Sequence, residues 1–219
     1  MIDGQLGDAQ TVLNVGAGAG SYEPAHRRVT ALEPSIEMIR QRAVPAHAVI
    51  QGIAEALPFP DHTFDAAMAV LTVHHWSDQR QGLRELRRVS RGPVVILTFD
   101  AANGLFWLVD YFPELIALDE AIMPPMTLYG EELGRVRILP VPVPHDCRDG
   151  FLAAYWRRPS AYLDPRVRAA ISSFHAIGDV TAALARLVGD IALGRWDERY
   201  GELMDREDFD CGYRLVVAG

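Results

Sequence analysis

Three closely spaced glycines near the start of the chain have the residue type and spacing of a ligand cradle. Residues 16–20 read Gly-Ala-Gly-Ala-Gly and follow the short apolar segment Thr11–Val15. A backbone without Cβ atoms can turn sharply there and approach a ligand closely. Glu33 ends the next apolar segment, and an acid in that place can accept hydrogen bonds from two ribose hydroxyls. These residues favour a ligand that carries a ribose.

The glycines alone leave the class of ligand open. Nicotinamide-dependent enzymes use a related pattern, G-x-G-x-x-G, followed by an acid about 20 residues further on. Gly16 and Gly18 match its first two glycines, but its third would fall at Ser21. The remaining segments therefore have to decide between the alternatives.

Two histidines are the candidates for proton transfer. His74 and His75 follow the apolar segment Phe64–Val73, and a histidine there can accept a proton from a substrate hydroxyl or amine. We take His75 as the candidate catalytic residue, with a purely structural role as the alternative. Glu55 is a second candidate acid, although we expect it to fix the loop that contains it.

Elements of two kinds alternate in the first hundred residues. Five apolar segments predict buried strands: Thr11–Val15, Arg28–Glu33, His47–Gln51, Phe64–Val73 and Val94–Phe99. One helical pattern begins at Pro34, and a second covers Gln79–Arg91. This alternation predicts a parallel sheet with helices on both faces, which binds ligands beyond the carboxyl ends of its strands. The glycines, Glu33, residues 52–55 and residues 70–75 all fall at such ends.

The second half has a different pattern. We expect helices at Leu105–Ile122, Phe151–Trp156, Arg166–Phe174 and within Val180–Leu203, and strands at Arg135–Val143 and Tyr213–Val217. Aromatic residues concentrate here, as expected for a core or for a lid over an apolar acceptor. Arg157 and Arg158 could hold an acceptor carboxylate or form a solvated helix end.

Composition excludes several classes of function. The net charge is −8 and no basic patch is present, so we expect no nucleic-acid partner. The chain has no lysine, which excludes Schiff-base chemistry. His145, Asp146 and Cys147 are consecutive and do not predict a metal site. Two distant cysteines, no signal pattern and no membrane-spanning run predict a cytoplasmic protein without a membrane partner.

Four motifs together carry a family resemblance. They are residues 12–20 (VLNVGAGAG), 31–38 (ALEPSIEM), 52–61 (GIAEALPFPD) and Phe64-Asp65 leading to residues 74–78 (HHWSD). In this order and at this spacing the chain resembles a class I S-adenosylmethionine (SAM)-dependent methyltransferase of the methyltransferase 11 or UbiE-like group. The resemblance covers roughly residues 11–100.

The resemblance implies a role for each matched position. It places the glycine turn around the methionine part of SAM and Glu33 on the ribose. Val70 and Leu71 would lie at the methionine amino end, and Pro34, Ile53 and Ala54 around the adenine. The implied cofactor-binding set is Asn14, Gly16, Ala17, Gly18, Glu33, Pro34, Ile53, Ala54, Val70 and Leu71.

The chain departs from the family pattern at three points. Asn14 replaces a frequent aspartate, and Ile53 replaces an aspartate that binds the adenine amino group in many relatives. Losing that hydrogen bond would weaken SAM binding by about 1 kcal/mol. The first strand also begins about ten residues into the chain, where relatives have a longer segment that closes over the cofactor. We therefore expect either a truncated start or a cover supplied by the second half.

We predict one α/β domain over residues 1–219. Its doubly wound, seven-stranded, mostly parallel sheet is Rossmann-like, and the resemblance makes its last strand antiparallel. A helical insertion before that strand, residues 148–205, is expected to form the substrate lid. The predicted reaction is methyl transfer from SAM to a small apolar or aromatic acceptor, carried out by a monomer or homodimer. The alternatives are a non-catalytic protein of this fold and a nicotinamide-dependent oxidoreductase, although the latter's Tyr-x-x-x-Lys pair requires a lysine.

Overall fold

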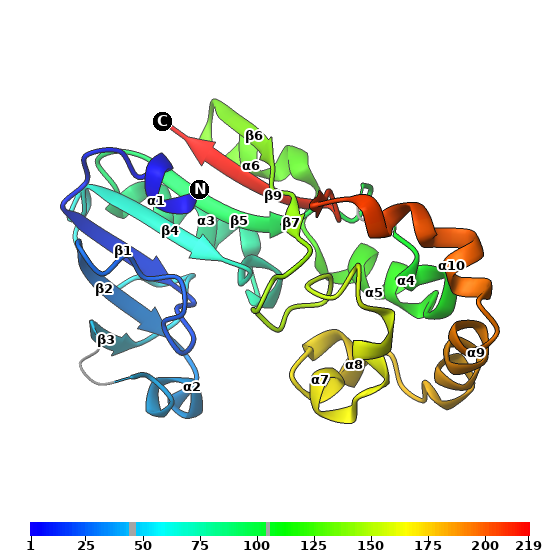
Figure 1. Cartoon of the computed structure of the whole chain (residues 1–219). Helices are drawn as coiled ribbons and strands as arrows, with labels where there is room; N and C mark the ends of the chain where they lie inside the picture. Colours follow the sequence, from blue (N-terminus) through cyan, green and yellow to red (C-terminus); the bar gives the residue numbers. More distant parts are fainter. Residues whose placement is uncertain (44–46, 104–105) are drawn as a thin grey trace. The chain divides into compact units, whose positions relative to one another are not determined.

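The chain folds into two compact units. The computed structural model describes residues 1–43, 47–103 and 106–219. The first unit contains Met1–Phe99, Met123–Leu139 and Arg214–Gly219, and the second contains Asp100–Ile122 and Pro140–Tyr213. Figure 1 shows the elements of each unit along the chain. The second unit thus includes more of the chain than the insertion predicted at residues 148–205.

A seven-stranded sheet organises the first unit. Its strands, in spatial order, are β3 (Ala48–Gln51), β2 (Arg28–Glu33), β1 (Thr11–Val15), β4 (Ala66–Val70), β5 (Val94–Phe99), β9 (Tyr213–Ala218) and β6 (Val136–Pro140). The four pairs from β3 to β5 are parallel. In Figure 1, β9 runs in the opposite direction to β5. The predicted mostly parallel, Rossmann-like sheet with an antiparallel last strand is confirmed.

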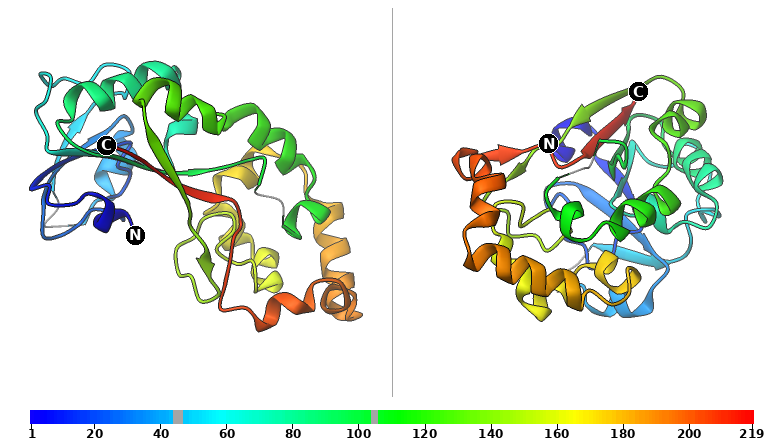
Figure 2. Two further views of the ribbon diagram at one scale, coloured as in Figure 1. Left: turned by 90° about the horizontal axis from the view of Figure 1, so that it is seen from above. Right: turned by 90° about the vertical axis from the view of Figure 1, so that its right-hand side faces the viewer.

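Two helices, α3 (Gln79–Val89) and α6 (Met126–Leu133), cover one face of this sheet (Figure 2). Leu83, Leu86 and Val89 recur at helical spacing on α3, and all three are fully buried. They join one apolar core with side chains of β1, β4, β5 and β9. Burial of a continuous helical stripe against apolar strands provides the main stabilisation of this unit.

The connection from β1 to β2 departs from the usual crossover. Parallel strands are normally joined through a helix. Residues 16–27, all of them described, form turns and contain no helix. The short helix α2 (Ile36–Arg40) comes only after β2, with Ser35 as its N-cap accepting from the Met38 N–H.

The second unit is mainly helical. It contains α4 (Leu108–Tyr111), α5 (Glu114–Ile122), α7 (Pro165–Ala169), α8 (Ser172–Ala176), α9 (Thr181–Ala192) and α10 (Arg195–Tyr200), the 3-10 turns η2 (Pro159–Leu163) and η3 (Gly201–Asp205), and the two-stranded pair β7 (Val143–Pro144) and β8 (Asp208–Phe209). Its core is aromatic. The Trp107 ring packs edge-on against Tyr111, Tyr162 and Trp196.

Several predicted helices of this half were wrong in detail. Leu105–Ile122 is two helices, because Pro113 follows the end of α4 and begins a new segment; its first residue, Leu105, lies outside the described residues. Phe151–Trp156 forms turns rather than a helix. The helix α6 was not predicted. No helix among the described residues is long and apolar enough to cross a membrane.

Candidate functional site

Four predicted segments meet at one edge of the sheet. β2, β1 and β4 are neighbours, so their carboxyl ends lie side by side. The N–H groups of Gly16 and Ala17 donate to the Leu32 carbonyl at 2.8 and 3.1 Å. The Gly52 N–H donates to the Glu33 carbonyl at 3.3 Å, which brings the loop after β3 to the same edge. These bonds assemble the residues that the sequence placed at the ends of strands.

The glycine turn needs its glycines. Gly16, Gly18 and Gly20 have φ angles of 69°, 53° and 88°, in the left-handed region that side chains disfavour. A Cβ atom at Gly16 would lie 2.0 Å from Oγ1 of Thr72, so that position is also closed sterically. The backbone of the turn therefore has no side chain at these three positions.

Glu33 is held in a fixed orientation at the end of β2. One carboxylate oxygen accepts from the Gly18 N–H at 2.8 Å and the other from the Ser35 N–H at 2.9 Å. The residue is 6% exposed. Two backbone donors thus fix the plane of a carboxylate directly beside the glycine turn.

Asn14 belongs to a buried polar group that the sequence did not reveal. Its Nδ2 donates to Glu23 at 3.2 Å, and Glu23 also accepts from Arg42. Among the described residues, no donor reaches the buried Oδ1 of Asn14. A buried carbonyl oxygen without a donor costs free energy, so this atom is suited to a ligand that brings an N–H group.

The backbone at the end of β4 is strained. Leu71 has a φ of 52°, although it is not a glycine, and its N–H is fixed by the Leu97 carbonyl at 2.8 Å. Such conformations cost about 1–3 kcal/mol and are concentrated at ligand sites. Val70, directly before it, is buried.

Apolar side chains that follow Glu33 in the chain, and one in the loop after β3, are exposed. Ile53 is 51% exposed and Ile36 is 38% exposed, whereas Ala54 is buried. Pro34 is also exposed. Large apolar side chains left in water beside an ordered carboxylate are suited to a flat apolar ligand group.

His74 and His75 form a short 3-10 turn, η1 (Val73–His75), after β4. Their rings lie 4.0 Å apart between centroids. Burial and then the neighbouring His75 lower the pKa of His74 to about 4. Partial loss of hydration lowers the pKa of His75, which is itself an exposed residue, while the negative charge of Glu33 acts in the opposite direction. Both rings are therefore neutral at neutral pH and able to accept a proton.

Glu55, an acid near the site, has a structural role. Glu55 accepts hydrogen bonds from the Ser77 N–H and hydroxyl and from the Asp78 N–H, at 2.7, 2.8 and 3.1 Å. Burial raises its pKa, but these donors outweigh burial and lower the pKa overall. Glu55 thus connects the loop after β3 to the turn after η1.

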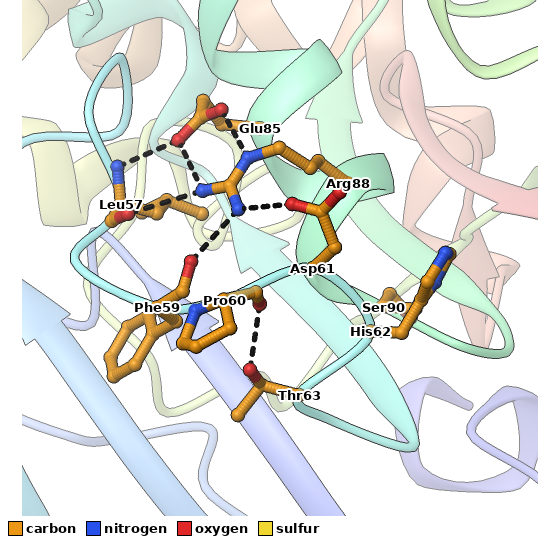
Figure 3. Close-up of polar contacts among 9 residues, drawn as sticks. All are labelled: Leu57, Phe59, Pro60, Asp61, His62, Thr63, Glu85, Arg88 and Ser90. Atoms are coloured by element: carbon orange, nitrogen blue, oxygen red, sulfur yellow. Dashed lines mark hydrogen bonds and ion pairs between the residues drawn. The ribbon is translucent and has the colours of Figure 1, made fainter.

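The loop that follows, residues 57–61, is tied to α3 by Arg88 (Figure 3). Its guanidinium donates to the carbonyls of Leu57 and Phe59 and to the carboxylates of Asp61 and Glu85. Glu85 in turn accepts from the Leu57 N–H at 2.9 Å. The Leu-Pro-Phe-Pro-Asp motif is thus held by one side chain of the helix that follows β4.

Other candidates from the sequence have ordinary partners. Arg157 donates to the Arg206 carbonyl, and Arg158 donates to the carbonyls of Cys147 and Ala154. The described residues contain no group of three metal-ligating side chains arranged around a common point.

Comparison with known proteins relates the chain to methyltransferases. A family model described as "Methyltransferase domain" matches residues 13–96. A crystal structure of a suspected methyltransferase from an antibiotic biosynthesis pathway of Anabaena variabilis is 37% identical, with a TM-score of 0.85, over 96% of this chain and 90% of that one.

Curated relatives match over a shorter length. The uncharacterised methyltransferase YcgJ of Bacillus subtilis is 33% identical over 51% of this chain and 45% of its own length. A chloroplastic 2-methyl-6-phytyl-1,4-hydroquinone methyltransferase of Oryza sativa is 31% identical over 48% of this chain and 34% of its own. The chain thus spans half or less of the curated relatives that it matches.

Proposed function

Because the chain belongs to the class I SAM-dependent methyltransferases, we propose that it transfers a methyl group from SAM to a small organic acceptor. The observation that carries this proposal is the fixed carboxylate of Glu33 beside a bare glycine turn. Such a carboxylate can accept hydrogen bonds from ribose hydroxyls, and the glycines of the turn, which lack Cβ atoms, admit a ligand against its backbone.

The residues at this edge fit the parts of SAM. Glu33 would hold the ribose, and Gly16, Ala17 and Gly18 would lie along the methionine part. The buried Asn14 Oδ1, which lacks a donor among the described residues, suits the methionine ammonium. Val70 and the strained Leu71 would offer backbone groups to the same end.

The adenine side would rely on apolar contact. The half-exposed Ile53 and the exposed Pro34 offer apolar surface, and the Ala54 backbone offers a hydrogen bond. An aspartate at position 53 would add a hydrogen bond to the adenine amino group. Its absence agrees with recognition through burial of the ring.

When bound, SAM would supply a methyl group on a positively charged sulfur, so that an acceptor atom can bond to the methyl carbon while the sulfur leaves as the neutral thioether S-adenosylhomocysteine. The chain's own task is then to align the acceptor and to exclude water, which can provide much of the rate. His75 would accept the proton that an acceptor hydroxyl or amine loses. Its lowered pKa keeps the ring unprotonated at neutral pH.

We also propose that the second unit selects the acceptor. The family model ends at residue 96, so this whole unit lies outside the part of the chain that the model matches. Its aromatic rings are mostly buried within the unit itself, so acceptor contacts would come from its edges. An apolar or aromatic acceptor is supported by the relative that acts on a phytyl hydroquinone.

Calorimetry with S-adenosylhomocysteine, the product form of the cofactor, tests the proposal. We expect saturable binding to the wild type, and its loss in Glu33→Ala, with NAD giving no heat in either protein. Binding of NAD alone would refute the assignment. Binding without turnover of any acceptor in a mass-spectrometric screen of phenols, quinols and amines would point to a non-catalytic role.

One substitution tests the role of His75. His75→Gln should lower kcat and leave the affinity for S-adenosylhomocysteine unchanged, because the residue acts on the acceptor. A general base typically contributes a factor of about 100 or more. An unchanged kcat would remove His75 from the mechanism.

A further inference from the structure

A buried ion pair stands where the first crossover lacks a helix. Arg42, which follows α2, donates to the two carboxylate oxygens of Glu23 at 2.7 and 2.5 Å. The two side chains are only 3% and 5% exposed. Glu23 lies within residues 16–27, the segment that forms turns instead of a crossover helix. The pair therefore anchors this segment to the chain beyond β2.

The same pair touches the glycine turn directly. Arg42 Nη1 donates to the Gly18 carbonyl at 3.1 Å. A Cβ atom at Gly20 would lie 3.2 Å from the guanidinium, so the turn runs closely along it. Glu23 also accepts from Asn14 at the end of β1. Three positions around the turn thus meet one ion pair.

Gly18 is consequently held from both sides. Its N–H donates to Glu33 at 2.8 Å, and its carbonyl accepts from Arg42. Glycine has more backbone freedom to lose than any other residue, so an unsupported turn would be expensive to order around a ligand. Contacts that order it beforehand remove that cost from binding.

We propose that Glu23 and Arg42 are positioning residues for the cofactor: their ion pair fixes the Gly18–Gly20 backbone in the conformation that receives it. This inference rests on the proposed function. A buried ion pair adds little stability compared with apolar side chains of similar volume. We therefore take the ordering of the Gly18–Gly20 backbone as the main effect of this pair. The ion pair also gives Asn14 a hydrogen-bond acceptor, the Glu23 carboxylate, whose negative charge is balanced by Arg42.

Glu23→Gln tests the proposal, with Glu132→Gln as its control. The Glu132 side chain is 6% exposed and accepts from Arg80 and Arg84, so the control makes the same chemical change in another arginine-bound carboxylate. Calorimetry at a temperature where all proteins are folded gives Kd for S-adenosylhomocysteine. We expect a rise of about tenfold in Glu23→Gln, from the lost preorganisation, and less than about twofold in Glu132→Gln.

Hydrogen exchange in the unliganded protein provides a readout without cofactor. The Gly18 and Gly20 amides should exchange faster in Glu23→Gln, while amides in β4 and β5 keep their rates. A role confined to stability would instead lower the melting temperature and leave both Kd and the local exchange unchanged.

The outcomes separate the two proposals. A wild type that does not bind S-adenosylhomocysteine refutes the proposed function. A wild type that binds, together with an unchanged Kd in Glu23→Gln or an equal rise in Glu132→Gln, overturns the positioning role. If Glu23→Gln does not fold, Arg42→Lys keeps the charge but loses the planar fork that reaches Gly18 and Glu23 together. An unchanged Kd in that variant overturns the inference equally.

Discussion

Gly16 lies directly against the side chain of Thr72, and this contact joins the turn after β1 to the end of β4. A Cβ atom on Gly16 would lie 2.0 Å from Oγ1 and 2.7 Å from Cβ of Thr72. Thr72 is 7% exposed and has little room to move aside. Because Gly16 has no side chain, the glycine turn can lie this close to the segment that carries His75.

Gly16→Ala should destabilise the protein strongly. Overpacking and a left-handed φ together predict a loss of about 2–4 kcal/mol in the free energy of unfolding, measured by urea denaturation. Gly4→Ala is the control, because nothing lies within 4 Å of its added Cβ and it sits in the short helix α1 (Ile2–Gln5). Similar losses in both variants would contradict this account.

Arg88→Met should loosen the loop of residues 57–61. The variant removes every hydrogen bond from the guanidinium to that loop and leaves Glu85 without its arginine (Figure 3). Because Arg88 is partly exposed, we expect a loss of about 1–2 kcal/mol. The double variant Arg88→Met, Glu85→Gln should lose less than the sum of the single changes. Strict additivity would show that the two residues act independently.

His74 should make stability depend on pH. Its pKa falls from 6.5 to about 4 on folding, so the unfolded chain binds protons more readily between these values. Stability from this residue is complete above pH 6.5 and is lost as pH falls towards 4, by about 2–3 kcal/mol. His74→Asn should flatten that part of the denaturation profile. A profile that keeps the wild-type slope would show that His74 is not held neutral.

Asp119 should have the opposite effect in the second unit. Burial alone raises the pKa of its carboxyl group to about 6, without an opposing hydrogen bond from a described residue. The folded protein therefore gains stability from this residue as pH falls from about 6 towards 4, and loses it at neutral pH. Asp119→Asn should stabilise the protein at pH 8 by about 1 kcal/mol, allowing for solvent screening. Destabilisation at pH 8 would indicate an ionised, partnered carboxylate.

The first half of the fold was predictable because its signals are local. β1, β2 and β5 have the predicted bounds, since each is an apolar run that ends at glycine, proline or a charge. In the second half, turns and short helices share one aromatic core, and periodicity cannot show where such a chain bends. Pro113 was nevertheless a visible break in the helix predicted at Leu105–Ile122.

The candidate site divides in the same way. Motif spacing placed Gly16, Gly18 and Glu33, and the structure brings them together. Motif spacing gave no indication of Glu23 or Arg42, because their pairing depends on the path that the chain takes after β2. Ion pairs between segments without periodicity leave no pattern in a single sequence. The lack of a helical pattern in residues 16–27 is the signal that could have prompted the search.

The helix-free crossover has a consequence for the order of folding. A crossover helix forms through contacts between neighbouring residues, which are quick to make. Glu23 and Arg42 are instead 19 positions apart, and Arg42 reaches its partner only when β2 and α2 are in place. The glycine turn should therefore acquire its final shape late, after the strands that flank it. A newly made chain would contain its first parallel strands before it could hold any ligand.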